Sequence, residues 1–206
     1  MRWMWIDQIV HFEPETRMVA VKNVSLAEEH LHDHFPADDQ HAEALPIMPV
    51  SLMIEGMAQT AGILVGSVTR FKEKVILAKI VRATIEKDVF PGQTIRYDAT
   101  LEAIQPAGAS TTGIVERFTH KASSADPNES SGHDDAQTQL RGGWGGVGGW
   151  EEIGRIDLMF SHIDQNISGL QFPEENFVFS DNFRTILHSA GLRPTGIPRF
   201  PLPFAG

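Results

Sequence analysis

The sequence of 206 residues contains no cysteine. The chain therefore forms no disulfide, offers no thiolate to a metal ion and has no cysteine nucleophile. It also lacks an apolar run approaching the roughly 20 residues that span a bilayer. The opening MRWMWIDQ reaches Asp7 before the apolar core of a signal peptide could develop. With no targeting signal in view, we expect a cytoplasmic protein without a membrane partner.

Basic residues are the minority: 17 Lys and Arg stand against 27 Asp and Glu, which gives a formal net charge of −10. Because phosphate binding needs a basic face, we expect no nucleic-acid partner. Six basic residues nevertheless gather within eighteen positions, namely Arg70, Lys72, Lys74, Lys79, Arg82 and Lys87. In an acidic protein this segment is either a docking face for an acidic partner or simply a solvated helix end and strand face.

The patterning predicts an α+β domain. A long apolar segment from Pro49 to Phe71 reads as a helix. The stretch TIRYDATLEAI alternates, with Ile95, Tyr97, Ala99, Leu101 and Ala103 on one side, as in a strand with one wet face. The stretches at 4–12, 17–24, 75–89, 110–120 and 153–163 suggest further strands. One long helix among about six antiparallel strands is typical of an α+β fold.

Low-complexity composition sets the expected domain limits. Residues 1–164 form the domain, interrupted by a glycine-rich insert at about 121–152 whose composition cannot bury enough surface to order itself. Residues 165–206 form a C-terminal extension. It contains a short helix from Asp181 to Ala190, stopped by Gly191, and a proline-rich tail.

A lone carboxylate marks the long helix. Ser51, Glu55 and Gln59 lie four residues apart on one line of it, and Glu55 is the only charged residue from Val50 to Thr69. The line is either a solvent stripe or a buried polar line, in which case Glu55 needs a partner or a shifted protonation. Three helix-weakening glycines, at 56, 62 and 66, predict that something approaches the helix closely.

Four histidines precede this helix, at 30, 32, 34 and 41, in an acidic segment that we expect to be a loop from Glu28 to Ala44. On an extended chain, His-x-His-x-His beside aspartates could hold Zn or Ni, although solvated loop histidines are the commoner case. His34 differs because Phe35 and Pro36 follow it. Pro36 biases Phe35 toward extended geometry, which would hold the imidazole in one place as a proton acceptor.

HFP followed by PIMPVSLMIEGMAQTAG resembles the active-site signature of the 3-hydroxyacyl-(acyl carrier protein) dehydratases, the FabZ-like members of the hot-dog superfamily. The stretches WIDQIVHFEPETRMVAVKNVS, VFPGQTIRYDATLEAI and IGRIDLMFS are similar to other parts of the same family. The resemblance covers about residues 2–118 and 153–161. It implies a hot-dog fold: an antiparallel sheet wrapped around one central helix, paired into a homodimer with shared active sites, with a trimer of dimers also allowed.

The resemblance also implies roles for individual residues. His34 of one subunit would remove the C2 proton of a (3R)-3-hydroxyacyl thioester, and Glu55 of the other would protonate the departing hydroxyl, leaving a trans-2-enoyl thioester. Val50, Gln59, Phe35 and Pro36 would form the oxyanion and substrate-binding surroundings. The substrate would be attached to the phosphopantetheine of acyl carrier protein, and the carrier protein would dock on the basic segment 70–87. The reaction would use no cofactor and no metal. The isomerising relative carries Asp in place of Glu55, which favours plain dehydration.

Three departures leave alternatives open. The linker ADDQHAEAL at 37–45 is longer than the family's, Val50 stands where the family has glycine, and the insert and tail are additions. A hot-dog thioesterase could use the helix carboxylate to activate water, with less need for His34. A non-catalytic hot-dog subunit could bind carrier protein without converting the acyl group. A histidine metal-binding module would need His30, His32 and His41 as much as His34.

Overall fold

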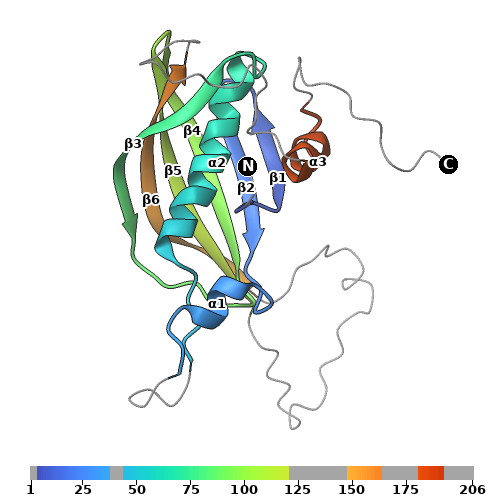
Figure 1. Cartoon of the computed structure of the whole chain (residues 1–206), viewed down its shortest axis with the longest axis vertical. Coiled ribbons are helices and arrows are strands. Elements are labelled where there is room, and N and C mark those ends of the chain that lie inside the picture. Colours follow the sequence, from blue (N-terminus) through green and yellow to red (C-terminus); the bar gives the residue numbers. More distant parts are fainter. Residues whose placement is uncertain (1–3, 38–43, 121–147, 164–180, 193–206) are drawn as a thin grey trace, which may run out of the picture.

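The structure is a computed structural model that describes residues 4–37, 44–120, 148–163 and 181–192 (Figure 1). Its elements in chain order are β1 (Gln8–Glu13), β2 (Arg17–Asn23), α1 (Glu29–Asp33), α2 (Val50–Val68), β3 (Lys74–Ile85), β4 (Thr94–Gln105), β5 (Gly108–His120), β6 (Gly148–Ile163) and α3 (Asp181–Ser189). The predicted strands and long helix are thus present.

Six strands form one antiparallel sheet in the order β1-β2-β4-β5-β6-β3. The sheet curves around α2, which contacts β2, β3, β4, β5 and β6 (Figure 1). Along β4, Ile95, Tyr97 and Ala99 are fully buried against the helix, as the alternation predicts, whereas Leu101 and Ala103 continue the strand toward solvent. A single helix enclosed by one antiparallel sheet is the expected hot-dog architecture.

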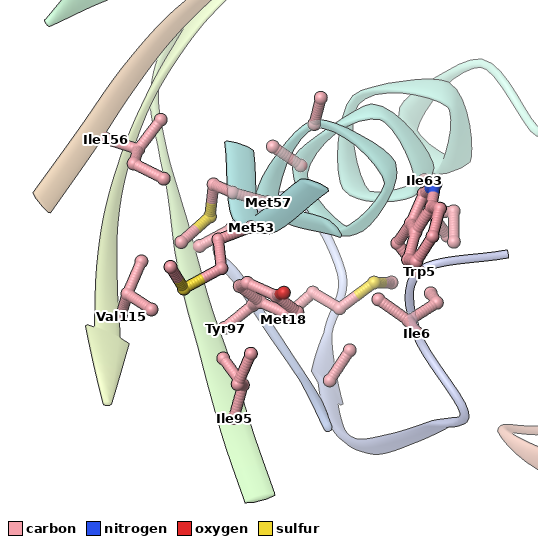
Figure 2. Packing of buried hydrophobic residues seen from close by; sticks show 14 of the residues in the cluster. Trp5, Ile6, Met18, Met53, Met57, Ile63, Ile95, Tyr97, Val115 and Ile156 are labelled. Carbon is pink, nitrogen blue, oxygen red and sulfur yellow. The ribbon is translucent and has the colours of Figure 1, made fainter. Parts of the chain in front are cut away.

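Helix α2 is long and apolar enough to pass a length-and-composition test for a membrane span, but 61% of its apolar window is buried inside the fold. Figure 2 shows Met53 of α2 beside Tyr97 of β4, and Met57 of α2 turned toward Ile156 of β6. The helix therefore forms one half of the hydrophobic core, and the concave face of the sheet forms the other.

The expected close approach to the glycines of α2 occurs at two of the three. A Cβ on Gly56 would lie 2.4 Å from Cζ of Tyr97, and a Cβ on Gly66 would lie 3.0 Å from Cδ1 of Phe71. At Gly62 the nearest side-chain atom, from Phe160, would be at an ordinary 3.5 Å. Gly56 is thus required by the ring of Tyr97, which presses against the turn that carries Glu55.

Two expected boundaries are wrong. The segment 28–44 is not wholly loop, because residues 29–33 form α1, anchored by the buried Leu31. The insert expected at 121–152 ends earlier, because β6 begins at Gly148 and its pairing with β5 runs out to His120. The rest of the insert, at 121–147, lies outside the described residues, as do the tail at 193–206 and residues 38–43 of the long linker.

The short helix expected in the C-terminal extension is confirmed as α3. It lies beside β1, and its Ile186 and Leu187 join the core of the domain (Figure 1). This part of the extension is therefore packed onto the domain.

Candidate active site

His34 is the C-cap residue of α1 and is half-buried. Its Nδ1 lies 2.5 Å from the carbonyl oxygen of Ile47, just before α2. A carbonyl oxygen only accepts hydrogen bonds, so Nδ1 is the nitrogen that carries the proton. In the neutral imidazole this leaves the lone pair on Nε2, the arrangement that a general base needs.

Phe35 departs from the expected extended geometry: its φ is +58°, in the left-handed region. Pro36 restricts the residue before it, but a second constraint prevails, because the Phe35 carbonyl accepts a hydrogen bond of 2.9 Å from the Leu45 N–H. Such a backbone costs about 1–3 kcal/mol for a non-glycine residue and is concentrated at functional sites.

Phe35 also contacts the imidazole of His34. The Phe35 ring lies 4.3 Å from the His34 ring, centroid to centroid, and is exposed on its other side, as is Pro36. The Phe35–Leu45 hydrogen bond links the chain just after His34 to the chain that leads into α2.

Glu55 lies in the second turn of α2 and is half-buried. Gln59, one turn later, is only 3% exposed, which excludes the solvent-stripe interpretation at that position. The Gln59 Nε2 donates to Glu55 Oε1 at 3.0 Å, while the Gln59 Oε1 accepts from the Trp5 N–H at 2.9 Å. The backbone of Trp5 thus orients the amide so that its N–H₂ group faces the carboxylate.

Val50 is the first residue of α2, and its side chain is exposed. Leu52 and Met53 N–H groups bond to the Pro49 carbonyl, whereas those of Val50 and Ser51 have no hydrogen-bond acceptor among the described residues. Free N–H groups at a helix start, together with the helix dipole, favour a negatively charged oxygen. The start of α2 is close to α1, which carries His34 (Figure 1).

His34 and Glu55 are not joined within the chain: no hydrogen bond or ion pair links them in the described ranges. His34 is fixed against the segment before α2, and Glu55 is fixed against Gln59 farther along the helix. The structure of a single chain brings together His34 with Phe35, and Glu55 with Gln59, as two separate pairs.

The six basic residues of 70–87 do not form one patch. Arg70 and Lys72 follow the C-terminal end of α2, Lys74 starts β3 and Lys87 lies past its other end, about 40 Å away along an extended strand. Arg82 pairs with Asp157 at 2.7 Å, and Lys87 pairs with Glu151, so their charges are partly neutralised. These residues are close in sequence but far apart in space, because β3 is extended.

The histidine segment does not form the extended array that a metal site would need, because His30 and His32 lie within α1. In the part of the chain that the structure describes, no three His, Asp or Glu side chains gather as metal ligands. His41, Asp38 and Asp39 lie outside that part.

Sequence reasoning missed a cluster of polar residues beside α1, centred on the buried Lys22. Its members are Asp7, Lys22, Glu28 and His30, with the Trp5 ring against His30. The only sequence signal was Lys22 within the apolar strand RMVAVKNV, which resembles an ordinary exposed position. The backbone groups of Ile47 and Trp5 that orient His34 and Gln59 leave no sequence signal, because every residue has them.

Comparison with known proteins agrees with this geometry. The model of the FabA-like domain family matches residues 2–119. The chain is 31% identical over 115 residues to a protein from Caldanaerobacter subterraneus named 3-hydroxyacyl-[acyl-carrier-protein] dehydratase FabZ, covering 55% of this chain and 77% of that protein. It is 33% identical over 112 residues to a protein of the same name from Clostridium tetani, covering 54% of this chain and 74% of that protein.

Among solved structures, the dehydratase heterocomplex ApeI:P from Xenorhabdus doucetiae is similar over 79% of this chain and 84% of that chain. The sequence identity is 11% and the TM-score 0.49, too low to support a conclusion about activity. The family match, in contrast, spans β1 to β5 and includes His34, Glu55 and both of their partners.

Proposed function

Because this chain belongs to the FabA-like family, with FabZ-type dehydratases among its relatives, we propose that it is a hydro-lyase that dehydrates (3R)-3-hydroxyacyl-(acyl carrier protein) thioesters to trans-2-enoyl thioesters. It would act in fatty acid or related acyl-chain synthesis, in the cytoplasm. The single observation that carries the proposal is the His34–Ile47 hydrogen bond, because it leaves Nε2 of a neutral imidazole as a base.

In the proposed reaction, Nε2 of His34 takes the proton from C2 of the substrate. The electron pair left at C2 forms the C2–C3 double bond as the C3–O bond breaks. Glu55, in its protonated form, gives its proton to the departing hydroxyl, which leaves as water. The imidazolium then returns its proton to the Glu55 carboxylate, directly or through water, so atoms and charge balance.

The Gln59 contact supports this role for Glu55. The amide N–H₂ donates to Oε1, which a carboxylic acid keeps as its carbonyl oxygen, so the acidic proton is directed to Oε2. Since Gln59 is itself held by the Trp5 N–H, the carboxyl group is oriented before substrate binds.

The start of α2 would serve the thioester oxygen, which gains negative charge when C2 loses its proton. The N–H groups of Val50 and Ser51 are suitable donors there. The exposed Val50 side chain, where the family has glycine, would narrow the space beside the thioester, and exposed Phe35 and Pro36 would line the approach.

We further propose that two chains pair along β3. This strand is at one end of the sheet order and exposes apolar side chains, namely Ile76, Leu77, Ile80 and Val81. Antiparallel pairing of β3 with a second β3 would satisfy both edges under twofold symmetry. Because His34 and Glu55 do not meet within one chain, each site would use His34 of one subunit and Glu55 of its partner.

Acyl carrier protein would be the partner, with the acyl group on its phosphopantetheine and no metal or other cofactor in the reaction. Arg70, Lys72 and Lys74, gathered around the end of α2, are the better candidates for docking it. Lys79, Arg82 and Lys87 are spread along β3 and past its end, so they do not gather at one place.

The direct test is an assay of the purified protein with a 3-hydroxyacyl pantetheine thioester and its carrier-bound form, beside His34→Ala and Glu55→Gln. General acids and bases contribute about 10²–10⁴-fold each, so either variant should lose enoyl formation while staying folded. Release of free thiol without enoyl product would indicate a thioesterase instead. A wild-type protein inert on both substrates that still binds carrier protein would indicate a non-catalytic subunit.

Mixing the two inactive variants tests the shared site. In mixed dimers, one of the two sites would combine an intact His34 with an intact Glu55, so activity should return to about a quarter of the wild-type value after random reassociation. If each site lay within one chain, no mixture would recover activity.

A further inference from the structure

We propose that the ion pair between the buried Lys22 and the half-buried Glu28, together with His30 and Trp5, positions both candidate catalytic groups, His34 through α1 and Glu55 through Gln59. These would be positioning residues, since none of them is placed against the substrate. This inference rests on the proposed function, and it assigns a role to a cluster that the dehydration chemistry does not otherwise use.

The cluster is centred on Lys22 in β2, whose side chain is only 9% exposed. Its ammonium group contacts Glu28 Oε1, the Asn23 carbonyl at 3.0 Å and Asp7 Oδ1 at 3.4 Å. Asp7 is itself fixed, because its Oδ2 accepts from the Asn23 N–H at 2.7 Å. A buried ammonium is costly unless it is paired, so these contacts are strongly directed.

One arm of the cluster leads to His34. Glu28 is the N-cap residue of α1 and His34 is its C-cap residue, about 9 Å farther along the axis. Leu31, between them, is buried and holds the helix on the core. Because α1 begins next to Glu28 and ends next to His34, the contact of Lys22 with Glu28 would fix where the backbone of His34 lies.

The other arm leads to Glu55. The second oxygen of Glu28, Oε2, lies 3.4 Å from Nε2 of His30. The His30 ring stands edge-on to the Trp5 indole, with centroids 5.1 Å apart and planes at 77°. Trp5 donates its backbone N–H to Gln59, which donates to Glu55. Glu28 thus reaches both candidate catalytic groups.

Two atoms in this path make no hydrogen bond among the described residues. Glu28 Oε2 and His30 Nε2 are buried, and neither has a hydrogen-bond partner in the described ranges, although they face each other. Burial lowers the pKa of His30, and the charges of Lys22 and of a protonated His34 lower it further, against the opposing effect of Glu28. A lowered pKa favours the neutral form of His30, whose ring stands against Trp5.

The experiment uses the full-length protein and pairs of variants. His30→Phe keeps a ring against Trp5, whereas His30→Ala removes it, and Lys22→Met removes the ammonium. We expect His30→Ala and Lys22→Met to lower kcat at least tenfold with KM within twofold of wild type, and His30→Phe to keep most of the activity. Asp98→Asn is the matched control, because it breaks the Arg17–Asp98 pair that also involves β2 but has no path to the site.

A second readout does not need turnover. Nitrogen NMR of the histidine rings reports which nitrogen of His34 carries the proton, with His34→Ala identifying its signals. We expect the Nδ1–H form in the wild type, Asp98→Asn and His30→Phe. In Lys22→Met we expect a mixture of the two tautomers, because α1 no longer holds the ring against the Ile47 carbonyl.

The outcomes separate the two proposals. If folded Lys22→Met and His30→Ala keep the wild-type kcat and the Nδ1–H form, the positioning role is wrong. If Lys22→Met does not fold, the isosteric Glu28→Gln gives the same comparison. If the wild type forms no enoyl product, the proposed function fails, and the NMR comparison still decides whether the cluster positions His34.

Discussion

The two edges of the sheet differ in length, in composition and in what covers them. β1 has six residues, carries a bulge between Ile9 and His11, and lies beside α3 (Figure 1). β3 has twelve residues, nearly all exposed, with four large apolar side chains accessible. The polar groups of an edge strand are a template for pairing with another chain, and folded proteins protect such edges unless pairing is intended.

The chain places a helix of its own beside one edge, and the other edge is the one along which we propose that a second copy pairs. At β1, a short bulged strand and a helix from the C-terminal extension protect the sheet. At β3, the only charged residues are Lys74, Lys79 and Arg82, and Arg82 is neutralised by Asp157 on the neighbouring strand. The proposed shared site depends on this asymmetry, because it needs the β3 edge and no other.

The largest effect should come from a charge on the open edge. Val81→Asp places a carboxylate where the dimer would bury it, so we expect a monomer in sedimentation velocity and a loss of dehydratase activity of about 10²-fold, since each site loses one of its two acid–base groups. Val10→Asp is the matched control. Val10 is a β1 valine that is 50% exposed, against 52% for Val81.

We expect Val10→Asp to leave the assembly and the activity unchanged. If both variants are monomeric, or neither is, the two edges are equivalent and the proposed pairing along β3 is wrong.

The next effect concerns the covered edge. Leu187 of α3 is fully buried among core residues, so Leu187→Ala should lower the free energy of unfolding by about 2–4 kcal/mol, as large-to-small core changes do. Chemical denaturation measures this. Activity per folded molecule should persist, because α3 packs on β1, whereas the printed hydrogen bonds of His34 and Glu55 go to Ile47 and Gln59. An unchanged midpoint would mean that α3 does not protect β1.

Much of this architecture can be predicted from the sequence, and the predictions that were wrong have physical causes. The alternation in β4 and the apolar run of α2 predict their elements because burial of one face dominates both. The predictions for α1 and Phe35 were wrong because they ignored tertiary contacts: Leu31 buries a polar-looking segment, and Leu45 holds Phe35 at positive φ. The family signature predicted His34 and Glu55 as candidates, but their backbone partners at Ile47 and Trp5 are visible only in the structure.

A smaller effect, a dependence of the free energy of unfolding on pH, is expected at the β1 side of the sheet. Beside β1 and β2, burial lowers the pKa of His30 from its usual 6.5, so the unfolded chain binds a proton there more readily than the folded chain. The free energy of unfolding should therefore fall as the pH drops through about 6.5, by way of His30. Denaturation of wild type and His30→Phe between about pH 7.5 and 5.5 isolates this contribution. If the free energy of unfolding changes equally with pH in the two proteins, His30 makes no such contribution.

The smallest effect is expected at the β3 side, where ion pairs face water. Arg82 is 59% exposed and its partner Asp157 is 18% exposed. Such a pair gains little over hydration and is screened by salt, so Asp157→Asn should change the free energy of unfolding by about 0–1 kcal/mol, and less at high salt. If the proposed dimer forms along β3, however, the pair lies beside the interface and leaves the solvent. The loss of unfolding free energy caused by Asp157→Asn should then increase with protein concentration and change little with salt. A loss that depends on salt and is independent of protein concentration would mean that β3 is not paired with a second chain.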